Sequence, residues 1–218
     1  MATAIVVIGG VPEHQVMPPP RALAAVEVVI AADSGWDLAV SLGLSVDVIV
    51  GDLDSISEAG LAAAEAAEVV IDRHPVDKES TDLELALAAA LGGEIDHIVV
   101  IGGEGGRFDH LVGNVSVLAS PRFAAVAIEA WIGDAYVTVV RDRWTAAVRP
   151  CATISILPWQ GPAALSVSGV RWPLRHEVLV AGTSRGISNE ADAAGAAVEI
   201  EVDDGVVMVL IPDSEDVR

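Results

Sequence analysis

Short apolar runs alternate with alanine- and leucine-rich stretches in the first part of the chain. The runs are nearly continuous Val and Ile, which is typical of strands that are buried on both faces of a sheet. Strands that alternate with helices need crossover connections, so the pattern predicts a Rossmann-like parallel sheet with helices on both faces. The expected strands lie at 4–8, 26–31, 46–50, 69–71 and 97–101.

Helix signals lie between these runs. Ser55 and Glu58 have the spacing of a capping box before an alanine-rich segment, and Thr81 and Glu84 repeat this spacing. A further helix is expected at 109–118, where apolar side chains recur on one face. We therefore expect Ser55 and Thr81 to be helix N-caps.

The pattern changes after about residue 123, where short strand-like runs are broken by Gly, Pro, Asn or Asp. The run Asp203-Asp204-Gly205 between the last two predicts a hairpin. We expect an α/β domain at 1–144 and an antiparallel β domain at 145–218. After about residue 123 the expected strands lie at 125–131, 136–140, 153–157, 165–168, 177–180, 198–202 and 206–211.

Composition narrows the range of partners. Hydrophobic residues make up 52% of the chain, which argues against disorder, and the formal net charge of −20 argues against nucleic acid or an anionic membrane surface as partner. The single cysteine, Cys151, excludes an internal disulfide framework and fits a reducing compartment. Lysine also occurs once, as Lys78, a skew that we attribute to base composition.

Neither a signal peptide nor a membrane span is expected. The N-terminal segment has no basic residues before its apolar run, so we interpret it as a first strand. No uninterrupted apolar run approaches the roughly 20 residues that cross a bilayer. We therefore expect a cytoplasmic protein.

Aspartates follow the expected strands of the parallel sheet. In such a sheet ligands bind beyond the carboxyl ends of the strands, so these positions carry functional weight. A single aspartate here is explained as a turn or cap residue, but six that converge would repel one another unless a cation lies among them. Mg²⁺ is the natural candidate, because it takes carboxylate and phosphate oxygens. The six are Asp33, Asp52, Asp54, Asp77, Asp82 and Asp109.

A glycine-rich loop follows the fifth expected strand. Gly102-Gly103 and Gly105-Gly106 flank Glu104, and so few side chains would let backbone N–H groups approach an anion. The adjacent Arg107 strengthens this interpretation, because a planar guanidinium suits phosphate oxygens. The loop therefore predicts a phosphate-binding site.

Three familiar phosphate-handling motifs do not fit. The P-loop is absent because Lys78, the only lysine, does not follow a glycine, and the dinucleotide fingerprint fails because Phe108 stands where its third glycine belongs. An aspartyl phosphatase could use Asp52-Leu53-Asp54, but such enzymes usually carry this loop on the first strand. That alternative also leaves the other acidic loops without a role.

Several motifs, in this order, resemble those of the thiamine pyrophosphokinase family. They are GDLDS at 51–55, D-x-x-x-T-D at 77–82, and GGEGGRFDH followed by Asn114. The segments SGVRWPL at 168–174 and GISNE at 186–190 are similar to those that form the thiamine-binding part of a β-sandwich domain in that family. The resemblance extends over roughly residues 33–211 and implies a C-terminal antiparallel β-sandwich.

The resemblance also implies an activity and a site. The pyrophosphoryl group of ATP would pass to the hydroxyl of thiamine with Mg²⁺ present, giving thiamine diphosphate and AMP in a homodimer with a composite site. Catalytic roles fall to Asp52, Asp54, Asp77 and Asp82, of which Asp52, Asp54 and Asp82 would bind metal. Nucleotide binding falls to Asp33, Ser55, Thr81, Gly103, Gly105, Gly106, Arg107, Asp109 and Asn114. Thiamine binding falls to Trp172, Ser188 and Asn189.

Two alternatives stay open beside this interpretation. One is a pyrophosphokinase of the same fold that acts on another small alcohol, against which Trp172 and Ser188-Asn189 favour thiamine. The other is a binding module without turnover, against which the many carboxylates favour catalysis. One departure from the family pattern is Ser34-Gly35-Trp36 after the first aspartate, where Trp36 could narrow a substrate pocket or start a helix.

Overall fold

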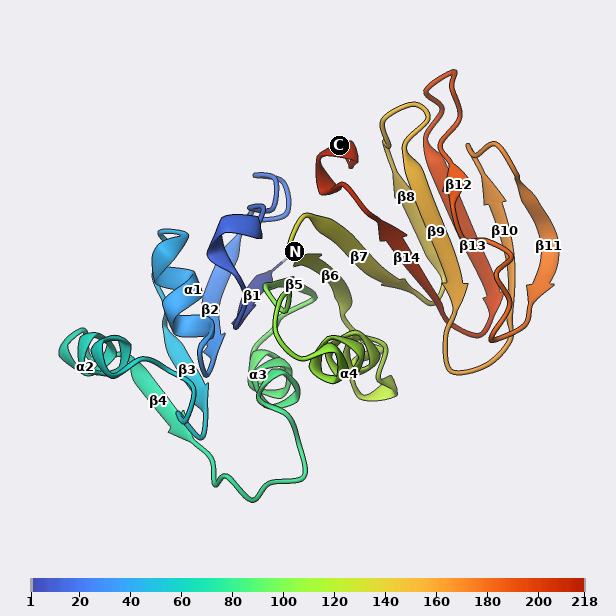
Figure 1. The fold of residues 1–218 in the computed structure, drawn as a ribbon. Coiled ribbons are helices and arrows are strands. Elements are labelled where there is room, and N and C mark those ends of the chain that lie inside the picture. The colour runs from blue at the N-terminus through green and yellow to red at the C-terminus, as the bar shows by residue number, and fades with distance from the viewer. Residues whose placement is uncertain (1, 218) are drawn as a thin grey trace. The chain divides into compact units, whose positions relative to one another are not determined.

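The computed structural model describes residues 2–217, and the chain divides between Gly133 and Asp134 into two compact units (Figure 1). The expected domain boundary at residue 145 lies inside strand β8 (Arg143–Ala146), which belongs to the second unit. As a boundary between functional domains, residue 145 stays a prediction. No helix in the described part of the chain is long and apolar enough to cross a membrane.

The first unit contains six parallel strands in the order β4-β3-β2-β1-β5-β6. β1 and β5 are buried along their whole length, as their continuous apolar runs predict. The predicted parallel sheet is thus confirmed. Its strands are β1 (Thr3–Ile8), β2 (Val26–Ala32), β3 (Val48–Gly51), β4 (Val70–Arg73), β5 (His97–Ile101) and β6 (Ala127–Ile132).

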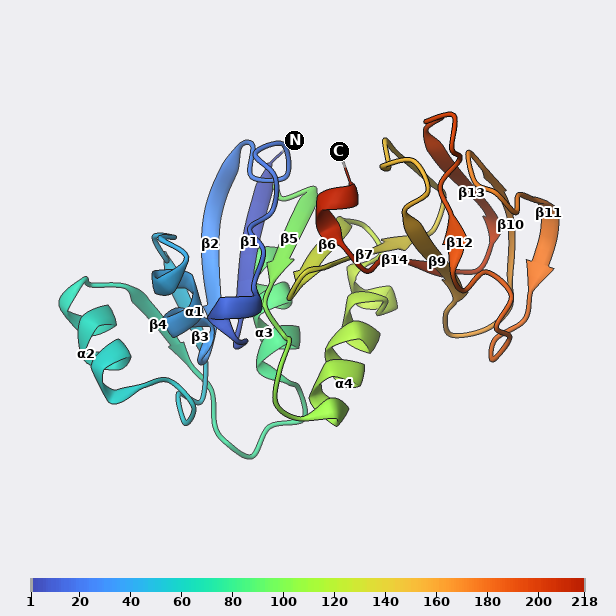
Figure 2. The ribbon, with the colours of Figure 1, turned by 45° about the horizontal axis from the view of Figure 1, so that its top comes forward.

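Helices connect these strands. The chain moves outward from β1 to β4 and returns to the other side of β1 at β5. Right-handed crossovers therefore place α1 and α2 on one face of the sheet and α3 and α4 on the other; α3 and α4 lie side by side in both views (Figures 1 and 2). The helices are α1 (Gly35–Ser41), α2 (Glu58–Ala66), α3 (Asp82–Ala90) and α4 (Phe108–Leu118), with short 3₁₀ turns η1 (Pro12–His14) and η2 (Pro121–Phe123).

Trp36 belongs to α1, and its side chain is buried. The helix approaches β1 so closely that a Cβ at Gly35 would lie 2.0 Å from the carbonyl oxygen of Val7. Trp36 therefore starts a helix and packs in the core, and of the two roles considered for it the structure favours this one.

One of the two predicted N-caps is confirmed and the other is wrong. Thr81 caps α3, because its Oγ1 accepts a hydrogen bond from the backbone N–H of Glu84 at 3.2 Å. The cap of α2 is Ser57, whose Oγ accepts from the N–H of Gly60 at 2.9 Å. α2 begins at Glu58, so Ser55 lies two residues before the cap position, and its hydroxyl donates to the carboxylate of Asp33.

The second unit is built from two antiparallel sets of strands, β12-β9-β14-β7 and β11-β10-β13-β8. Buried and exposed residues alternate along β13, as in a strand that covers a core with one face. The predicted antiparallel β-sandwich is confirmed. Its strands are β7 (Ala135–Val140), β8, β9 (Thr153–Pro158), β10 (Ala163–Ser168), β11 (Leu174–Leu179), β12 (Asn189–Glu190), β13 (Val198–Asp204) and β14 (Val207–Ile211), followed by η3 (Ser214–Asp216).

The predicted hairpin at Asp203-Asp204-Gly205 is wrong. β13 pairs with β8 and β10, whereas β14 pairs with β7 and β9, so the two strands lie in different sets. Gly205 has a φ of +87°, and a Cβ there would lie 2.5 Å from the carbonyl oxygen of Pro162. The turn therefore carries the chain from one layer of the sandwich to the other, because both strands have an apolar face to bury in the same core.

Candidate active site

A cavity of about 700 Å³ opens at the carboxyl ends of the parallel strands in the first unit. It lies where β1 has β2 on one side and β5 on the other, so the connections on its two sides run in opposite directions. This topological switch point is where open α/β sheets bind ligands. The predicted site residues that line the cavity are Asp33, Asp52, Asp54, Ser55, Thr81, Asp82, Gly103, Gly105, Gly106, Arg107, Asp109 and Asn114.

Asp77 is the predicted residue of this set that does not line the cavity. Its side chain is exposed in the loop between β4 and α3. The structure therefore gives no geometric support to a catalytic role for Asp77, which stays a prediction from the resemblance.

Asp33, Asp52 and Asp82 form a carboxylate cluster. One oxygen from each lies within 4.8 Å of the others. The three residues come from different elements, since Asp33 follows β2, Asp52 follows β3, and Asp82 is the first residue of α3. Asp54, which the sequence groups with Asp52 and Asp82 as a metal ligand, lines the cavity but is exposed and outside this cluster.

Lys78 lies against the carboxylate cluster. Its Nζ is 2.5 Å from Asp52 Oδ2 and 3.1 Å from Asp82 Oδ1, and its side chain is only 13% exposed. The hydrogen bond from Lys78 lowers the pKa of Asp52 below its ordinary value. Burial acts to lower the pKa of Lys78, but its bonds to Asp52 and Asp82 outweigh burial and raise this pKa above its ordinary value.

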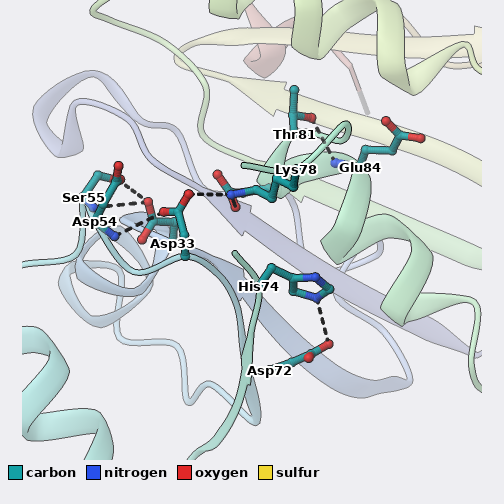
Figure 3. A network of polar contacts seen from close by, with 10 residues as sticks. Asp33, Asp54, Ser55, Asp72, His74, Lys78, Thr81 and Glu84 are labelled. Atoms are coloured by element: carbon teal, nitrogen blue, oxygen red, sulfur yellow. Dashed lines mark hydrogen bonds and ion pairs between the residues drawn. The ribbon is translucent and has the colours of Figure 1, made fainter. Parts of the chain in front are cut away.

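Asp33 is the most buried of the three carboxylates, and burial raises its pKa above the ordinary value. Its Oδ2 accepts hydrogen bonds from the hydroxyl and the backbone N–H of Ser55 (Figure 3). Its Oδ1 is buried without a hydrogen-bond partner. A buried, unsatisfied oxygen in a set of oxygen donors fits a hard divalent cation such as Mg²⁺.

The backbone around this cluster adopts unusual conformations. Asp33 and Leu53 have φ values of +49° and +67°, a region that a bulky residue such as Leu rarely adopts. A Cβ at Gly51 would lie 3.0 Å from Asp82 Oδ1, and the φ of this glycine is +150°. Such strain persists where the surroundings hold it in place, and here it shapes the turn that carries Asp52 and Asp54.

The glycine-rich loop is fixed against the end of β1. The backbone N–H of Gly103 donates to the carbonyl of Gly9 at 2.8 Å. A Cβ at Gly102, where φ is +106°, would lie 2.1 Å from the carbonyl oxygen of Ile8. Gly9 and Gly10 also line the cavity, which sequence reasoning missed although both directly follow the first expected strand.

Arg107 forms a fork with Asp109 at the start of α4. Its Nε lies 3.1 Å from Asp109 Oδ1 and its Nη2 lies 2.6 Å from Oδ2, and both side chains are exposed. The hydrogen bonds of this pair raise the pKa of Arg107 and lower that of Asp109. Asp109 thus holds the guanidinium at the cavity wall, where its other N–H groups can meet an anion.

A second cavity, of about 600 Å³, lies in the second unit and is lined by all three residues predicted to bind thiamine, Trp172, Ser188 and Asn189. The backbone N–H of Trp172 donates to Asn189 Oδ1 at 3.1 Å, and Asn189 Nδ2 donates to the carbonyl of Trp172 at 2.9 Å. Asn189 is buried while the indole of Trp172 is half exposed, with the guanidinium of Arg171 4.6 Å from its ring. The amide of Asn189 therefore fixes the segment that presents the indole.

Fold and site together define a class of protein: an α/β unit with a carboxylate cluster and a glycine-rich anion loop, followed by an antiparallel sandwich with its own cavity. Residues 20–130 match the family model described as thiamin pyrophosphokinase, catalytic domain. Residues 146–207 match the model described as thiamin pyrophosphokinase, vitamin B1 binding domain. The chain belongs to the thiamin pyrophosphokinase family.

Individual relatives agree with this assignment. A thiamine pyrophosphokinase of Bacillus subtilis is 36% identical over 89 residues, which is 41% of this chain and 42% of the relative. Thiamine pyrophosphokinase 1 of Oryza sativa is 29% identical over 157 residues, or 66% of this chain and 58% of the relative. The matched segments thus span less than two thirds of these relatives. The crystal structure of a Bacillus subtilis thiamine pyrophosphokinase has the same fold, with a TM-score of 0.81 at 24% identity over 96% of this chain and 98% of that one.

Proposed function

We propose that the protein transfers the pyrophosphoryl group of ATP to the hydroxyl of thiamine, giving thiamine diphosphate and AMP, with Mg²⁺ as the metal. The observation that carries this proposal is the cavity of the first unit, which gathers three carboxylates, a glycine-rich loop and an arginine around one space. Its volume of about 700 Å³ lies in the range of small-molecule and cofactor sites.

Asp33, Asp52 and Asp82 would hold the Mg²⁺, whose charge would offset that of the phosphate oxygens. The unsatisfied Oδ1 of Asp33 and the close approach of the three carboxylates support this assignment. Ser55 would act on Asp33 and not on the nucleotide directly, because its hydroxyl and N–H both bind the Oδ2 of Asp33. Asp54, assigned to the metal by resemblance, would handle metal or phosphate from the cavity wall.

The remaining groups of the cavity would orient the phosphates. Gly103, Gly105 and Gly106 all have positive φ and present a loop without side chains, where backbone N–H groups can donate to phosphate oxygens. Thr81 Oγ1 accepts a bond from its own helix, so its hydroxyl proton is available to donate. Arg107 supplies a fixed positive charge. Phosphoryl-type transfer depends mainly on such positioning and charge stabilisation.

The cavity of the second unit would bind thiamine. The thiazolium ring is a cation, and an exposed indole such as that of Trp172 attracts a cation by about 0.5–2 kcal/mol. Ser188 is exposed at the cavity and can donate to or accept from an aminopyrimidine. Asn189 would orient Trp172 and not contact thiamine, since both ends of its amide bind the backbone of Trp172.

We also propose a homodimer in which the first unit of one subunit and the second unit of the other complete the site. The support is the family assignment, together with the finding that each cavity is lined by residues of a single unit.

Incubation of the protein with ATP, Mg²⁺ and thiamine, followed by chromatography, tests the proposed reaction. AMP and thiamine diphosphate should form in equal amounts, and neither should form when thiamine is omitted. ADP in place of AMP would contradict pyrophosphoryl transfer, and a lack of any thiamine-dependent product would favour a different alcohol or a binding module.

A further inference from the structure

The ammonium of Lys78 lies beside the carboxylates that would bind a metal ion. Its ammonium contacts carboxylate oxygens of both Asp52 and Asp82, at 2.5 and 3.1 Å, and these two residues belong to the cluster that would hold a divalent cation. A divalent cation held by Asp52 and Asp82 would lie close to this ammonium, and the two like charges would repel each other. The lysine therefore stands in competition with any cation that enters the carboxylate cluster.

The third member of the cluster has no such partner. Asp33 contributes an oxygen to the cluster, yet its buried Oδ1 lacks a hydrogen bond and is not among the oxygens that Lys78 contacts. Lys78 donates a hydrogen bond to Asp52, whereas Asp82 Oδ1 forms an ion pair with it and has no hydrogen bond. One monovalent charge thus faces three carboxylates. The ammonium offsets only part of their mutual repulsion, and the charge of a divalent cation would offset more.

The position of Lys78 in the chain allows it to move. It lies in the loop between β4 and α3, outside any helix or strand, and its neighbours Asp77 and Glu79 are exposed. Asp33, Asp52 and Asp82 are instead fixed by the ends of β2 and β3 and by the first turn of α3. The lysine can leave the cluster without disturbing the elements that carry the carboxylates.

We propose that Lys78 is an internal counter-ion that holds the carboxylate cluster together in the metal-free protein and is displaced when Mg²⁺ binds. Its ammonium then turns to the phosphates of the nucleotide, so that metal and nucleotide bind cooperatively. This inference rests on the proposed function only in that Mg²⁺ and a nucleotide share the cavity. Lys78 is in this sense a positioning residue for the metal site.

Because Lys78 is the only lysine in the chain, isotopic labelling of lysine gives a single side-chain NMR signal that reports on it directly. Addition of MgCl₂ to the metal-free protein should shift and narrow the Cε–Hε signal of Lys78, while NaCl at equal ionic strength should not. Subsequent addition of the non-transferable analogue α,β-methylene-ATP should shift the signal again. A signal that does not respond to Mg²⁺ would overturn the proposal.

Calorimetric titration with Mg²⁺ in the absence of nucleotide gives an independent test. Lys78→Met should bind Mg²⁺ at least about tenfold more tightly than the wild type, as expected if the cluster is open to metal in about a tenth or less of wild-type molecules. Lys78→Arg, which keeps the charge, should not gain affinity. Arg73→Met removes a positive charge from a nearby exposed residue outside the cavity and should change the affinity less than twofold.

Unchanged or weaker Mg²⁺ binding by Lys78→Met would contradict the proposal. If that variant does not fold, Lys78→Gln replaces it with the same expected gain, and the NMR titration needs no substitution. In the presence of saturating Mg²⁺, Lys78→Met should bind α,β-methylene-ATP more weakly than the wild type, and equal affinity would exclude the contact with phosphate. None of these measurements involves thiamine or turnover, so a failure of the proposed reaction is observed separately.

Discussion

At the scale of the residue, the carboxylates of the first unit differ in their surroundings and therefore in their expected behaviour. Asp33 is buried and bonded to Ser55, Asp52 is paired with Lys78, and Asp54 is exposed on the cavity wall. Substitutions that remove one charge at a time should separate a role in catalysis from a role in folding.

Asp54→Asn should lower kcat about 10²–10³-fold and leave the fold intact. Removal of one preorganised electrostatic group from an active site, such as an oxyanion-hole donor, lowers kcat about 10²–10³-fold, whereas substitution of an exposed residue changes stability by about 0.5 kcal/mol or less. Asp72→Asn is a matched control, because Asp72 is exposed, pairs with His74 and lies outside the cavity (Figure 3). A collapse of thermal stability in Asp54→Asn would show that this aspartate is structural.

Asp33→Asn should stabilise the metal-free protein at neutral pH. Burial raises the pKa of Asp33, so its ionised form costs the folded state free energy, and stability falls as pH rises from the unfolded value of about 3.9 through the folded pKa. Asparagine tolerates the positive φ at this position and removes only the charge.

Thermal unfolding in EDTA between pH 3 and 8 tests whether ionisation of Asp33 lowers the stability of the metal-free protein. The variant should unfold at a higher temperature than the wild type at pH 7, by about 2–4 °C for each kcal/mol, and the difference should vanish below about pH 4. Mg²⁺ should raise the unfolding temperature of the wild type more than that of the variant. A variant less stable than the wild type at pH 7 in EDTA would rule out the assigned burial cost.

The sequence predicted twelve of the cavity residues, some from their positions after expected strands and others from the family resemblance, but it did not resolve their pairing. The scarcity of lysine was attributed to base composition, so Lys78 was given no role. The expected metal ligands were Asp52, Asp54 and Asp82, without Asp33. These pairings depend on which side chains the loops bring together in space. Asp33 and Asp82 are far apart in the sequence, yet their carboxylate oxygens lie in one cluster. Sequence spacing carries no direct signal for such proximity.

At the scale of the element, the capping-box pattern predicted the cap of α3 correctly and that of α2 wrongly. Both Ser55 and Thr81 have a glutamate three residues later, yet only Thr81 caps a helix. For α2 the spacing pointed to Ser55, but the helix begins at Glu58 and is capped by Ser57, while the hydroxyl of Ser55 donates to Asp33, distant in sequence. The capping-box spacing thus placed the cap of α2 two residues too early.

Ser57→Ala should therefore change mainly stability, and Ser55→Ala mainly Mg²⁺ binding and activity. Ser57→Ala removes the cap of α2 and should cost about 1 kcal/mol of stability, with little change in kcat/KM. Ser55→Ala removes a bond to Asp33 and should weaken Mg²⁺ binding and lower kcat/KM, with little loss of helix stability. Denaturant unfolding and steady-state kinetics on both variants check this, and an unchanged kcat/KM in Ser55→Ala would contradict the role of Ser55 at Asp33.

The turn between β13 and β14 shows that a turn signal in the sequence does not predict how the flanking strands pair. The Asp203-Asp204-Gly205 sequence is correct as a turn signal, and Gly205 does adopt positive φ. The signal does not say whether the strands on either side pair with each other or face each other across a core. The almost complete burial of β14 and the alternating burial of β13 show that they do the latter.

At the scale of the whole molecule, the fold class followed from the sequence because it depends on periodicity. Continuous apolar runs predicted the parallel sheet, short runs broken by turn residues predicted an antiparallel β domain, and the family resemblance implied that this domain is a sandwich. The assembly of subunits has no comparable signal in a single chain, and the homodimer stays a prediction from the family resemblance.

Mixing of two impaired variants, one in each unit, tests the proposed composite site. If the two units of different subunits complete each site, Asp54→Asn and Trp172→Ala together should recover about a quarter of the wild-type activity, since half of randomly mixed dimers contain one intact site. Each variant alone should remain impaired. No recovery after subunit exchange, with dimers confirmed by light scattering, would place both units of a site in one chain.

The central claim is that two phosphoryl groups leave ATP together. ATP labelled with ³²P at the β position, incubated with the protein, Mg²⁺ and thiamine, tests this claim most directly. The account predicts that the β label appears in thiamine diphosphate and that the released nucleotide is unlabelled AMP. Recovery of the β label in ADP, with only a γ label reaching thiamine, would contradict it.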